Sequence, residues 1–132
     1  MPRATWPLRR GGPSVEISLT FAIGGQTTSR HLLADTGAGS ATGAFELILE
    51  ENDCLLCGGN PTLMVQLGGA HSGSFPVYGI RVRVPQIGFD DELQVVGVPS
   101  LPSGIDGIAG FRFLRRFTFG NFGNPDQFGL DS

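Results

Sequence analysis

Glycine and proline limit what this chain can fold into more than any other feature. The 132 residues include 21 Gly and 9 Pro. Glycine loses the most backbone freedom on folding, and proline lacks the N–H that helix interiors and central strands require. Long helices are therefore not expected, and short strands joined by tight turns are. The length suits a single domain, and 40% hydrophobic against 16% charged residues argues against disorder.

The pattern of apolar residues predicts a mostly β fold. Residues Val15–Ile23 alternate between apolar and polar side chains, which is typical of a half-buried strand. Gly24-Gly25 then indicates a hairpin turn into a second strand, Gln26–Ala34. Ala44–Asn52 fits a short helix or a strand equally well, and Cys54–Pro61 is expected to be a turn. Further strands are expected at Thr62–Leu67, Val77–Val84, Leu93–Val98 and Phe128–Leu130, with one short helix ending Ile105–Phe117.

The sequence before Ser14 has no periodicity and contains Pro2, Pro7 and Pro13. We predict that residues 1–13 are a flexible N-terminal tail, with pairing to another subunit as the alternative. Residues 14–132 would form the folded domain. The N-terminal segment has no apolar stretch typical of a signal peptide, so a cytoplasmic location is expected.

Charge excludes several classes of function. All nine basic residues are Arg, so neither a Schiff-base lysine nor a phosphate-loop lysine is possible within this sequence. The net charge of −3, without a basic block, argues against a nucleic-acid partner. No apolar run approaches the ~20 residues that a membrane span needs, so no membrane partner is expected.

The main chemical signal is the run Leu32-Leu33-Ala34-Asp35-Thr36-Gly37-Ala38, in which a strand delivers a carboxylate into a tight turn. The Thr36 hydroxyl can clamp a neighbouring loop, and Gly37 leaves room for another backbone or a substrate. Two further elements follow in the chain. A glycine-rich loop, Gly68–Gly73, lies between two strand-like runs, and Ile108-Ala109-Gly110 precedes the expected helix.

These three elements, in this order, resemble the retropepsin-like aspartic proteases over roughly residues 15–119. The resemblance implies a closed β-barrel with one short C-terminal helix, and it implies no metal and no organic cofactor. By this resemblance Asp35 is the catalytic residue, supported by its loop residues Thr36, Gly37 and Ala38. The flap that closes over a peptide substrate would include Gly68, Gly69, Ala70, His71, Ser72 and Gly73. The apolar-apolar-Gly element that supports the catalytic loop would be Ile108, Ala109 and Gly110.

One chain supplies only half of such a site. The chemistry needs one ionised carboxylate to take a proton from water and one protonated carboxyl to polarise the peptide carbonyl. The sequence contains one Asp-Thr-Gly, and the only other acid followed by glycine is Asp106, which lacks the hydroxyl residue. The resemblance therefore implies a homodimer, held by paired terminal strands and by hydroxyls such as that of Thr36 crossing between subunits.

The chain also departs from the family pattern. Retroviral members carry an acid after the DTGA motif and an arginine after the second glycine, and the two form an ion pair. Here those places hold Gly39 and Phe111, so the ion pair cannot be carried over. Arg112 occupies a position where many cellular relatives have Asp.

Three alternatives remain open at this point. The fold could serve as a catalytically silent dimerisation or peptide-binding module. The run Gly37–Gly43 follows a strand and matches a dinucleotide-binding loop if Ala44–Asn52 is a helix. Cys54 and Cys57 form a CxxC that fits half a zinc site, a redox pair or two inert structural thiols. Zinc needs four ligands, and His31 and His71 are not at zinc-finger spacing.

Overall fold

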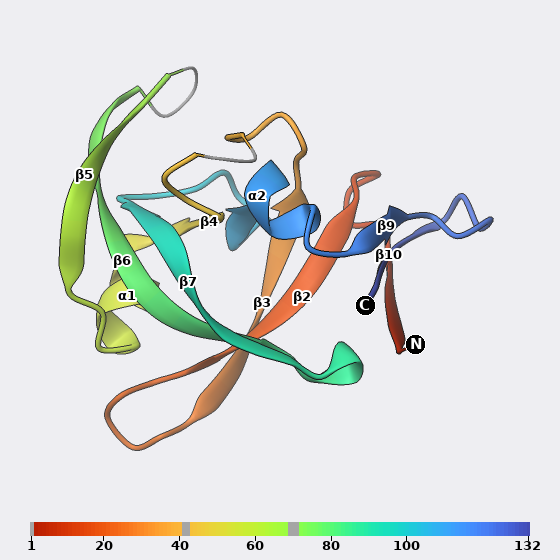
Figure 1. Ribbon diagram of the computed structural model, residues 1–132, viewed down its shortest axis with the longest axis horizontal. Coiled ribbons are helices and arrows are strands. Elements are labelled where there is room, and N and C mark those ends of the chain that lie inside the picture. Colours follow the sequence, from red (N-terminus) through yellow and green to blue (C-terminus); the bar gives the residue numbers. More distant parts are fainter. Residues whose placement is uncertain (1, 41–42, 69–71) are drawn as a thin grey trace.

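The computed structural model describes residues 2–40, 43–68 and 72–132. Within these residues, ten strands, two short α-helices and one short 3-10 helix follow one another (Figure 1). In chain order they are β1 (Arg3–Pro7), β2 (Ser14–Thr20), β3 (Thr27–Ala34), β4 (Leu47–Glu50), α1 (Glu51–Leu56), β5 (Pro61–Leu67), β6 (Gly73–Val84), η2 (Pro85–Ile87), β7 (Phe89–Val98), β8 (Gly107–Ala109), α2 (Phe111–Leu114), β9 (Thr118–Gly120) and β10 (Gln127–Asp131).

Six strands close into a barrel in the order β2-β3-β8-β4-β7-β6, and β6 returns to β2. The closing seam is short, with only Ser18 paired to Arg83 and Leu19 paired to Val82. Strand β5 is added at the outside of β6, so these two strands form a hairpin beyond the barrel. The predicted mostly β barrel with a short C-terminal helix, α2, is confirmed.

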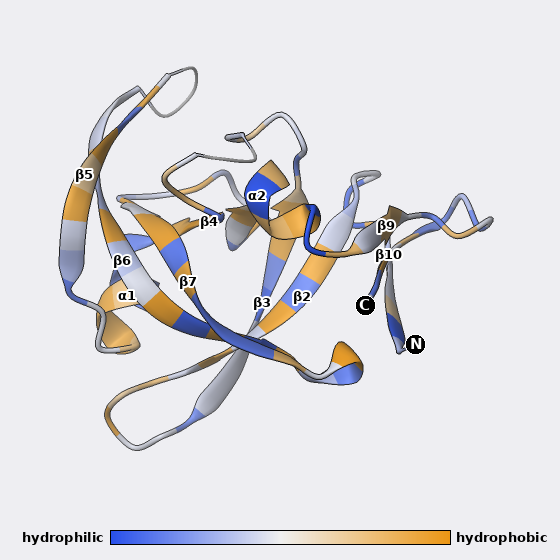
Figure 2. Cartoon of the chain, viewed as in Figure 1, coloured by the Kyte–Doolittle hydropathy of each residue, from blue (hydrophilic) through white to orange (hydrophobic). Residues whose placement is uncertain are grey.

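Alternating side chains explain why these segments form strands. In β2, Val15, Ile17 and Leu19 are fully buried while the intervening side chains are more exposed. The hairpin to β3 turns at Gly24 and Gly25, whose φ angles of 83° and 67° lie in the left-handed region that glycine tolerates. Figure 2 shows the same alternation as bands of opposite hydropathy along β6 and β7. The strands predicted at Val15–Ile23, Gln26–Ala34, Val77–Val84 and Leu93–Val98 are all present.

The segment that the sequence left undecided contains both kinds of structure. Residues 47–50 form β4, which lies between β7 and β8 in the barrel. The chain then enters α1, which continues through Leu56, so the turn predicted from Cys54 begins about one helical turn late. Cys54 on this helix is fully buried in the main core, and the helix therefore covers part of the barrel.

The prediction of a flexible tail is wrong for residues 3–7. They form β1, which pairs antiparallel with β10 from Arg3–Asp131 to Pro7–Gln127. Ala4 and Trp6 are buried in the main core, so the segment is held by side-chain packing as well as by strand pairing. The terminal strands thus pair with each other within one chain, and Figure 1 shows the two ends of the chain side by side.

The candidate site lies at the ends of three neighbouring barrel strands. Strand β8 runs parallel to β3 and antiparallel to β4, and Ala109 pairs with both Ala34 and Leu47. Asp35 and Gly110 therefore leave two neighbouring strands at the same edge. A second, smaller core cluster lies next to this edge and under the β5–β6 hairpin; its buried members are Phe45, Ile48, Val77, Val96 and Val98. In the described part of the chain, the helices are too short and too polar for any of them to cross a membrane.

Candidate active site

Asp35 is positioned by the pairing of β3 with β8. Its backbone N–H donates to the carbonyl of Ala109 at 2.9 Å, which continues the strand pairing by one residue. The side chain is half-buried at the end of β3. A carboxylate at the end of a buried strand is fixed by the rigid barrel although its oxygens remain accessible.

The turn after Asp35 fixes one of the two carboxylate oxygens. Asp35 Oδ1 accepts a hydrogen bond from the Gly37 N–H at 2.9 Å, and the Ala38 N–H donates to the Asp35 carbonyl at 3.1 Å. A Cβ on Gly37 would lie 3.2 Å from Asp35 Oδ1, so a side chain there would press on the carboxylate. Among the described residues, nothing donates to Asp35 Oδ2, which leaves this oxygen free to contact a water or a substrate.

The apolar-apolar-Gly element supports this turn from behind. Phe111 N–H donates to the Ala38 carbonyl, and Gly110 N–H donates to the Glu46 carbonyl, both at 2.9 Å. A Cβ on Gly110 would lie 2.8 Å from Ala38 O and 3.1 Å from Glu46 O, so only glycine fits between the two carbonyls. Glycine at this position therefore allows α2 to pack directly against the Asp35 loop.

Asp35 lines a pocket of about 460 Å³. Apolar side chains from β4, β8 and the β5–β6 hairpin form much of its wall, and Asp35 is the only ionisable residue among the described residues that line it. The lining residues are Asp35, Gly37, Ala38, Gly39, Phe45, Ile48, Gln66, Leu67, Gly68 and Ile108. One carboxylate thus lies in a mostly apolar pocket between the barrel edge and the hairpin.

The predicted flap coincides with the end of this hairpin. Gly68 lines the pocket, and Ser72 and Gly73 are exposed at the start of β6. Gln66 Nε2 donates to Ser74 Oγ across the two strands at 2.6 Å. Gly69, Ala70 and His71, which the sequence also assigns to the flap, lie outside the described residues.

The structure brings only some of the remaining predicted site residues to the Asp35 pocket. Ile108 lines the pocket, and Ala109 is fully buried beneath the turn. Thr36 is exposed, and its hydroxyl has no hydrogen-bond partner in the portion of the chain that the structure describes. An exposed, unpaired hydroxyl beside the carboxylate is available to a second molecule.

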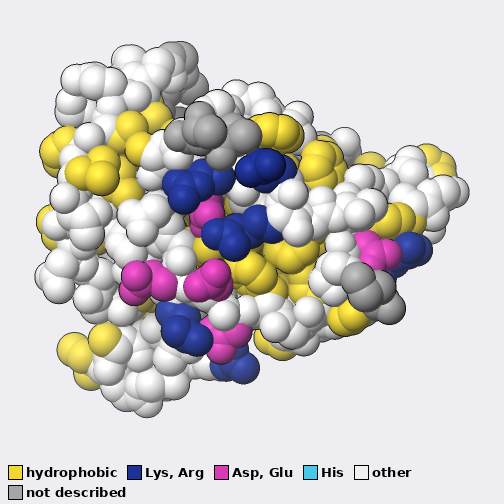
Figure 3. All heavy atoms as spheres, in the orientation of Figure 1, with side chains coloured by type: hydrophobic (Ala, Val, Ile, Leu, Met, Phe, Trp, Pro, Cys, Tyr) yellow, Lys and Arg dark blue, Asp and Glu magenta, His cyan; other side chains and the backbone are white. Residues whose placement is uncertain are grey.

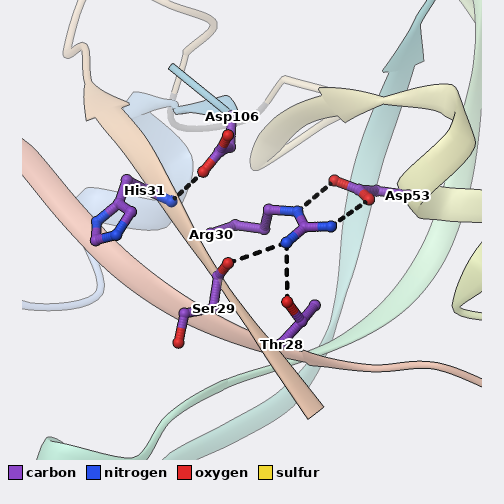
Figure 4. A network of polar contacts seen from close by, with 6 residues as sticks. All are labelled: Thr28, Ser29, Arg30, His31, Asp53 and Asp106. Carbon is purple, nitrogen blue, oxygen red and sulfur yellow. Dashed lines mark hydrogen bonds and ion pairs between the residues drawn. The ribbon is translucent and has the colours of Figure 1, made fainter. Parts of the chain in front are cut away.

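Asp106 does not complete the site. Its carboxylate accepts a hydrogen bond from the His31 backbone N–H at 2.9 Å, and Figure 4 shows it beside the middle of β3. The same figure shows Arg30 bridging β3 to α1 through two hydrogen bonds to the Asp53 carboxylate, at 2.8 and 3.0 Å. The bond to Asp53 raises the pKa of Arg30, so this ion pair holds its charges and acts as a structural brace.

Sequence reasoning missed an ionic cluster next to the Asp35 loop. The side chain of Glu46 is only 2% exposed, and its Oε1 accepts a hydrogen bond from Arg116 and lies 3.6 Å from Arg112 Nε. Arg112 NH1 also donates to the Gly43 carbonyl at 2.9 Å. Figure 3 shows dark-blue side chains gathered over α2 around a magenta one. An ionic link therefore joins α2 to the segment after the Asp35 loop, although Gly39 and Phe111 cannot form one. The available signal was a single acid within the apolar run from Phe45 to Leu49.

The two cysteines have the properties of inert thiols. Neither is in a disulfide, and burial raises the pKa of Cys54 to about 12 and also raises the pKa of Cys57. A thiol reacts through its thiolate, so a raised pKa disfavours both nucleophilic and redox chemistry. Within residues 2–40, 43–68 and 72–132, no group of three or more His, Cys, Asp or Glu side chains is arranged to hold a metal ion.

The structure contradicts the alternative of a dinucleotide-binding loop. That motif needs a helix immediately after the glycine-rich turn, because the helix N-terminus binds the pyrophosphate. Here residues 43–46 are irregular and lead into strand β4, and α1 begins only at Glu51.

Comparisons with known proteins give little beyond a distant structural likeness. No protein-family model matches the sequence, and no curated protein matches it. Among solved structures, the chain is similar to a retropepsin-like aspartic protease from Rickettsia conorii, with 16% identity and a TM-score of 0.48 over 90% of this chain and 92% of that chain.

Proposed function

We propose that this protein is an aspartic endopeptidase that acts as a homodimer, with Asp35 of each subunit flanking one water molecule. One observation carries the proposal. Asp35 is the only ionisable residue among the described residues lining its pocket, and it lies in an Asp-Thr-Gly turn opposite a β-hairpin. A single accessible carboxylate at a barrel edge suits a site that a second copy completes.

The reaction requires two carboxyl groups that share one proton. Two carboxylates about 3 Å apart repel each other by roughly 5 kcal/mol at an effective dielectric constant near 20, so one of them stays protonated. The ionised group takes a proton from the attacking water, and the protonated group polarises the scissile carbonyl. A two-fold axis beside the Asp35 turn makes the two groups equivalent by sequence.

Each neighbouring element has a role in this scheme. The exposed Thr36 hydroxyl would donate across the two-fold axis to the partner's loop, which stabilises the pair of turns. The Gly37 N–H holds Oδ1, so Oδ2 faces the reacting groups. The backbone of the hairpin around Gly68 would pair with an extended peptide in the manner of an added strand. The scheme uses no metal and no organic cofactor.

The test is cleavage of a mixed peptide library between about pH 3 and 8, because one proton must stay on the pair for activity. The parent protein is compared with Asp35→Asn and with Asp126→Asn, an exposed aspartate remote from the pocket lining. We expect cleavage by the parent and by Asp126→Asn, and none by Asp35→Asn. Equal cleavage by all three proteins would indicate a contaminant or another nucleophile and would refute the proposal.

A negative result is informative when the oligomeric state is measured at the same concentration. A dimer that cleaves no peptide would favour the catalytically silent dimerisation or peptide-binding module. In that case a peptide that binds the parent protein should still bind Asp35→Asn. A protein that stays monomeric at high concentration would refute the half-site mechanism itself.

A further inference from the structure

A second hollow, of about 340 Å³, lies beside α2 and is lined by Glu46, Arg112, Arg115 and Arg116. It shares no lining residue with the Asp35 pocket. Phe45 lines the Asp35 pocket, and the next residue, Glu46, lines this hollow. The hollow is therefore a separate site on the other side of residues 43–46, and Figure 3 shows its dark-blue side chains gathered at one face.

The three guanidinium groups in this hollow are unusually free. Each guanidinium carries five N–H donors. In the described part of the chain, the three together donate only two hydrogen bonds, Arg112 to Gly43 O and Arg116 to Glu46 Oε1. Arg30 alone donates four. Arg30 thus uses four of its five donors within the protein, whereas most donors in the hollow have no partner among the described residues.

The hollow also carries an excess of positive charge. Glu46 is the only acid that lines it, against three arginines. Asp91 lies 3.7 Å from Arg116 NH1, but its side chain is 58% exposed, so water weakens this pair. Arg115 has no acidic partner among the described residues. Arginine binds tetrahedral and planar oxyanions through paired N–H donors, and such an anion would neutralise the excess charge.

Glu46 restricts which anion fits. Its Oε2 is buried and has no hydrogen-bond donor among the described residues. A buried acceptor without a donor costs free energy, and a ligand that carries an O–H removes this cost. Sulfate at neutral pH has no proton to donate. A phosphate monoester has its second pKa at about 6, and that of inorganic phosphate is higher, so part of either population keeps one P–O–H at neutral pH.

We propose that this hollow binds a phosphate-type oxyanion, either free or as a small monoester. The arginine N–H groups donate to the unprotonated phosphate oxygens, and the remaining P–O–H donates to the Glu46 carboxylate. Arg115 supplies the largest share of unused donors. The hollow and the Asp35 pocket have no lining residue in common, so phosphate binding can be measured without the proposed peptidase reaction.

Isothermal titration calorimetry at constant ionic strength tests this site with inorganic phosphate, glycerol phosphate and sulfate. The protein is compared with Arg115→Gln and with the matched control Arg83→Gln, which removes an exposed arginine from β6. We expect saturable phosphate binding that Arg115→Gln weakens by about tenfold or more and that Arg83→Gln leaves unchanged. Binding of glycerol phosphate as well would identify an esterified ligand, and its absence would identify the free anion.

Glu46→Gln tests the selectivity. Its amide offers an N–H donor in place of a carboxylate oxygen, so sulfate should gain affinity relative to phosphate. The Trp6 fluorescence of the folded state shows whether this variant folds, and Arg115→Gln carries the test if it does not. No saturable binding of phosphate, equal binding of sulfate by the parent protein, or equal weakening by Arg83→Gln would each overturn the proposal.

Discussion

Replacing Gly110 by Ala tests whether the contact between α2 and the Asp35 loop is as tight as the structure indicates. Gly110 has φ −82° and ψ 173°, an extended conformation that alanine adopts without strain. Any loss of stability must therefore come from steric contacts of the new Cβ atom. The new Cβ would lie 2.8 Å from Ala38 O and 3.1 Å from Glu46 O, and both oxygens belong to the backbone and cannot rotate away.

The expected loss of stability follows from these contacts. An ordinary carbon–oxygen contact is about 3.3 Å or longer, so the loop and α2 must separate by several tenths of an ångström. Overpacking of this kind costs about 1–3 kcal/mol. Weakening the hydrogen bonds from Phe111 to Ala38 and from Gly110 to Glu46 adds about 0.5–1.5 kcal/mol each, and the lower entropy of the unfolded chain offsets about 0.4–1 kcal/mol. The net destabilisation should be about 1–5 kcal/mol.

Urea unfolding followed by fluorescence measures this value, since the chain contains a single Trp, and Trp6 is buried. Gly12→Ala is the matched control, because its Cβ would meet Leu33 Cδ1 at 3.4 Å and Arg9 O at 3.6 Å, which are ordinary contacts. It should change the unfolding free energy by less than about 1 kcal/mol. If the two variants are equally stable, the close packing of α2 on the Asp35 loop is wrong.

Three further predictions concern stability and assembly. Burial raises the pKa of Cys54 and of Tyr78 to about 12, from 9.0 and 10.0. Both groups therefore stabilise the fold fully below pH 9 and lose this contribution as the pH rises toward 12. The melting temperature should fall over this pH range, and a constant melting temperature would contradict the prediction. Asp53→Asn should lower the free energy of unfolding by about 2–4 kcal/mol, because it leaves a part-buried Arg30 unpaired. Asp131→Asn removes a more exposed ion pair and should lower it by about 1 kcal/mol or less in the same urea assay. Equal losses from the two substitutions would refute this prediction. Finally, specific activity should fall on dilution if the site exists only in the dimer, and activity independent of concentration would argue against a shared site.

Local patterns were enough to predict the barrel strands. In β2 and β6 the alternation of apolar and polar residues matches the observed burial, since each strand has one face in the core. The Asp35 turn could also be predicted, because an Asp, a hydroxyl residue and a glycine follow an apolar strand. The hydrogen bond that closes this turn joins residues only two positions apart. The roles of the Asp35 turn and the hairpin in catalysis remain predictions.

Contacts between distant parts of the chain could not be predicted in the same way. Residues 3–7 alternate correctly, but their only strand partner lies more than a hundred residues later, and the prolines suggested a loose tail. Glu46 and Arg116 are likewise distant in sequence, and their ion pair depends on the residue before β4 meeting the turn after α2. The sequence did not distinguish helix from strand over Ala44–Asn52, because a four-residue strand runs directly into a six-residue helix there.

The pairing of β1 with β10 has a consequence for synthesis of the protein. A ribosome delivers β1 before the barrel strands, and β10 emerges only after all six strands of the barrel. Until then the backbone edge of β1, the strand that carries Ala4 and Trp6, has no partner strand. The barrel can form before β1 has its partner strand, so the protein exposes an open strand edge during most of its translation. A chaperone that binds extended apolar segments would therefore find a binding segment in β1 until β10 is made.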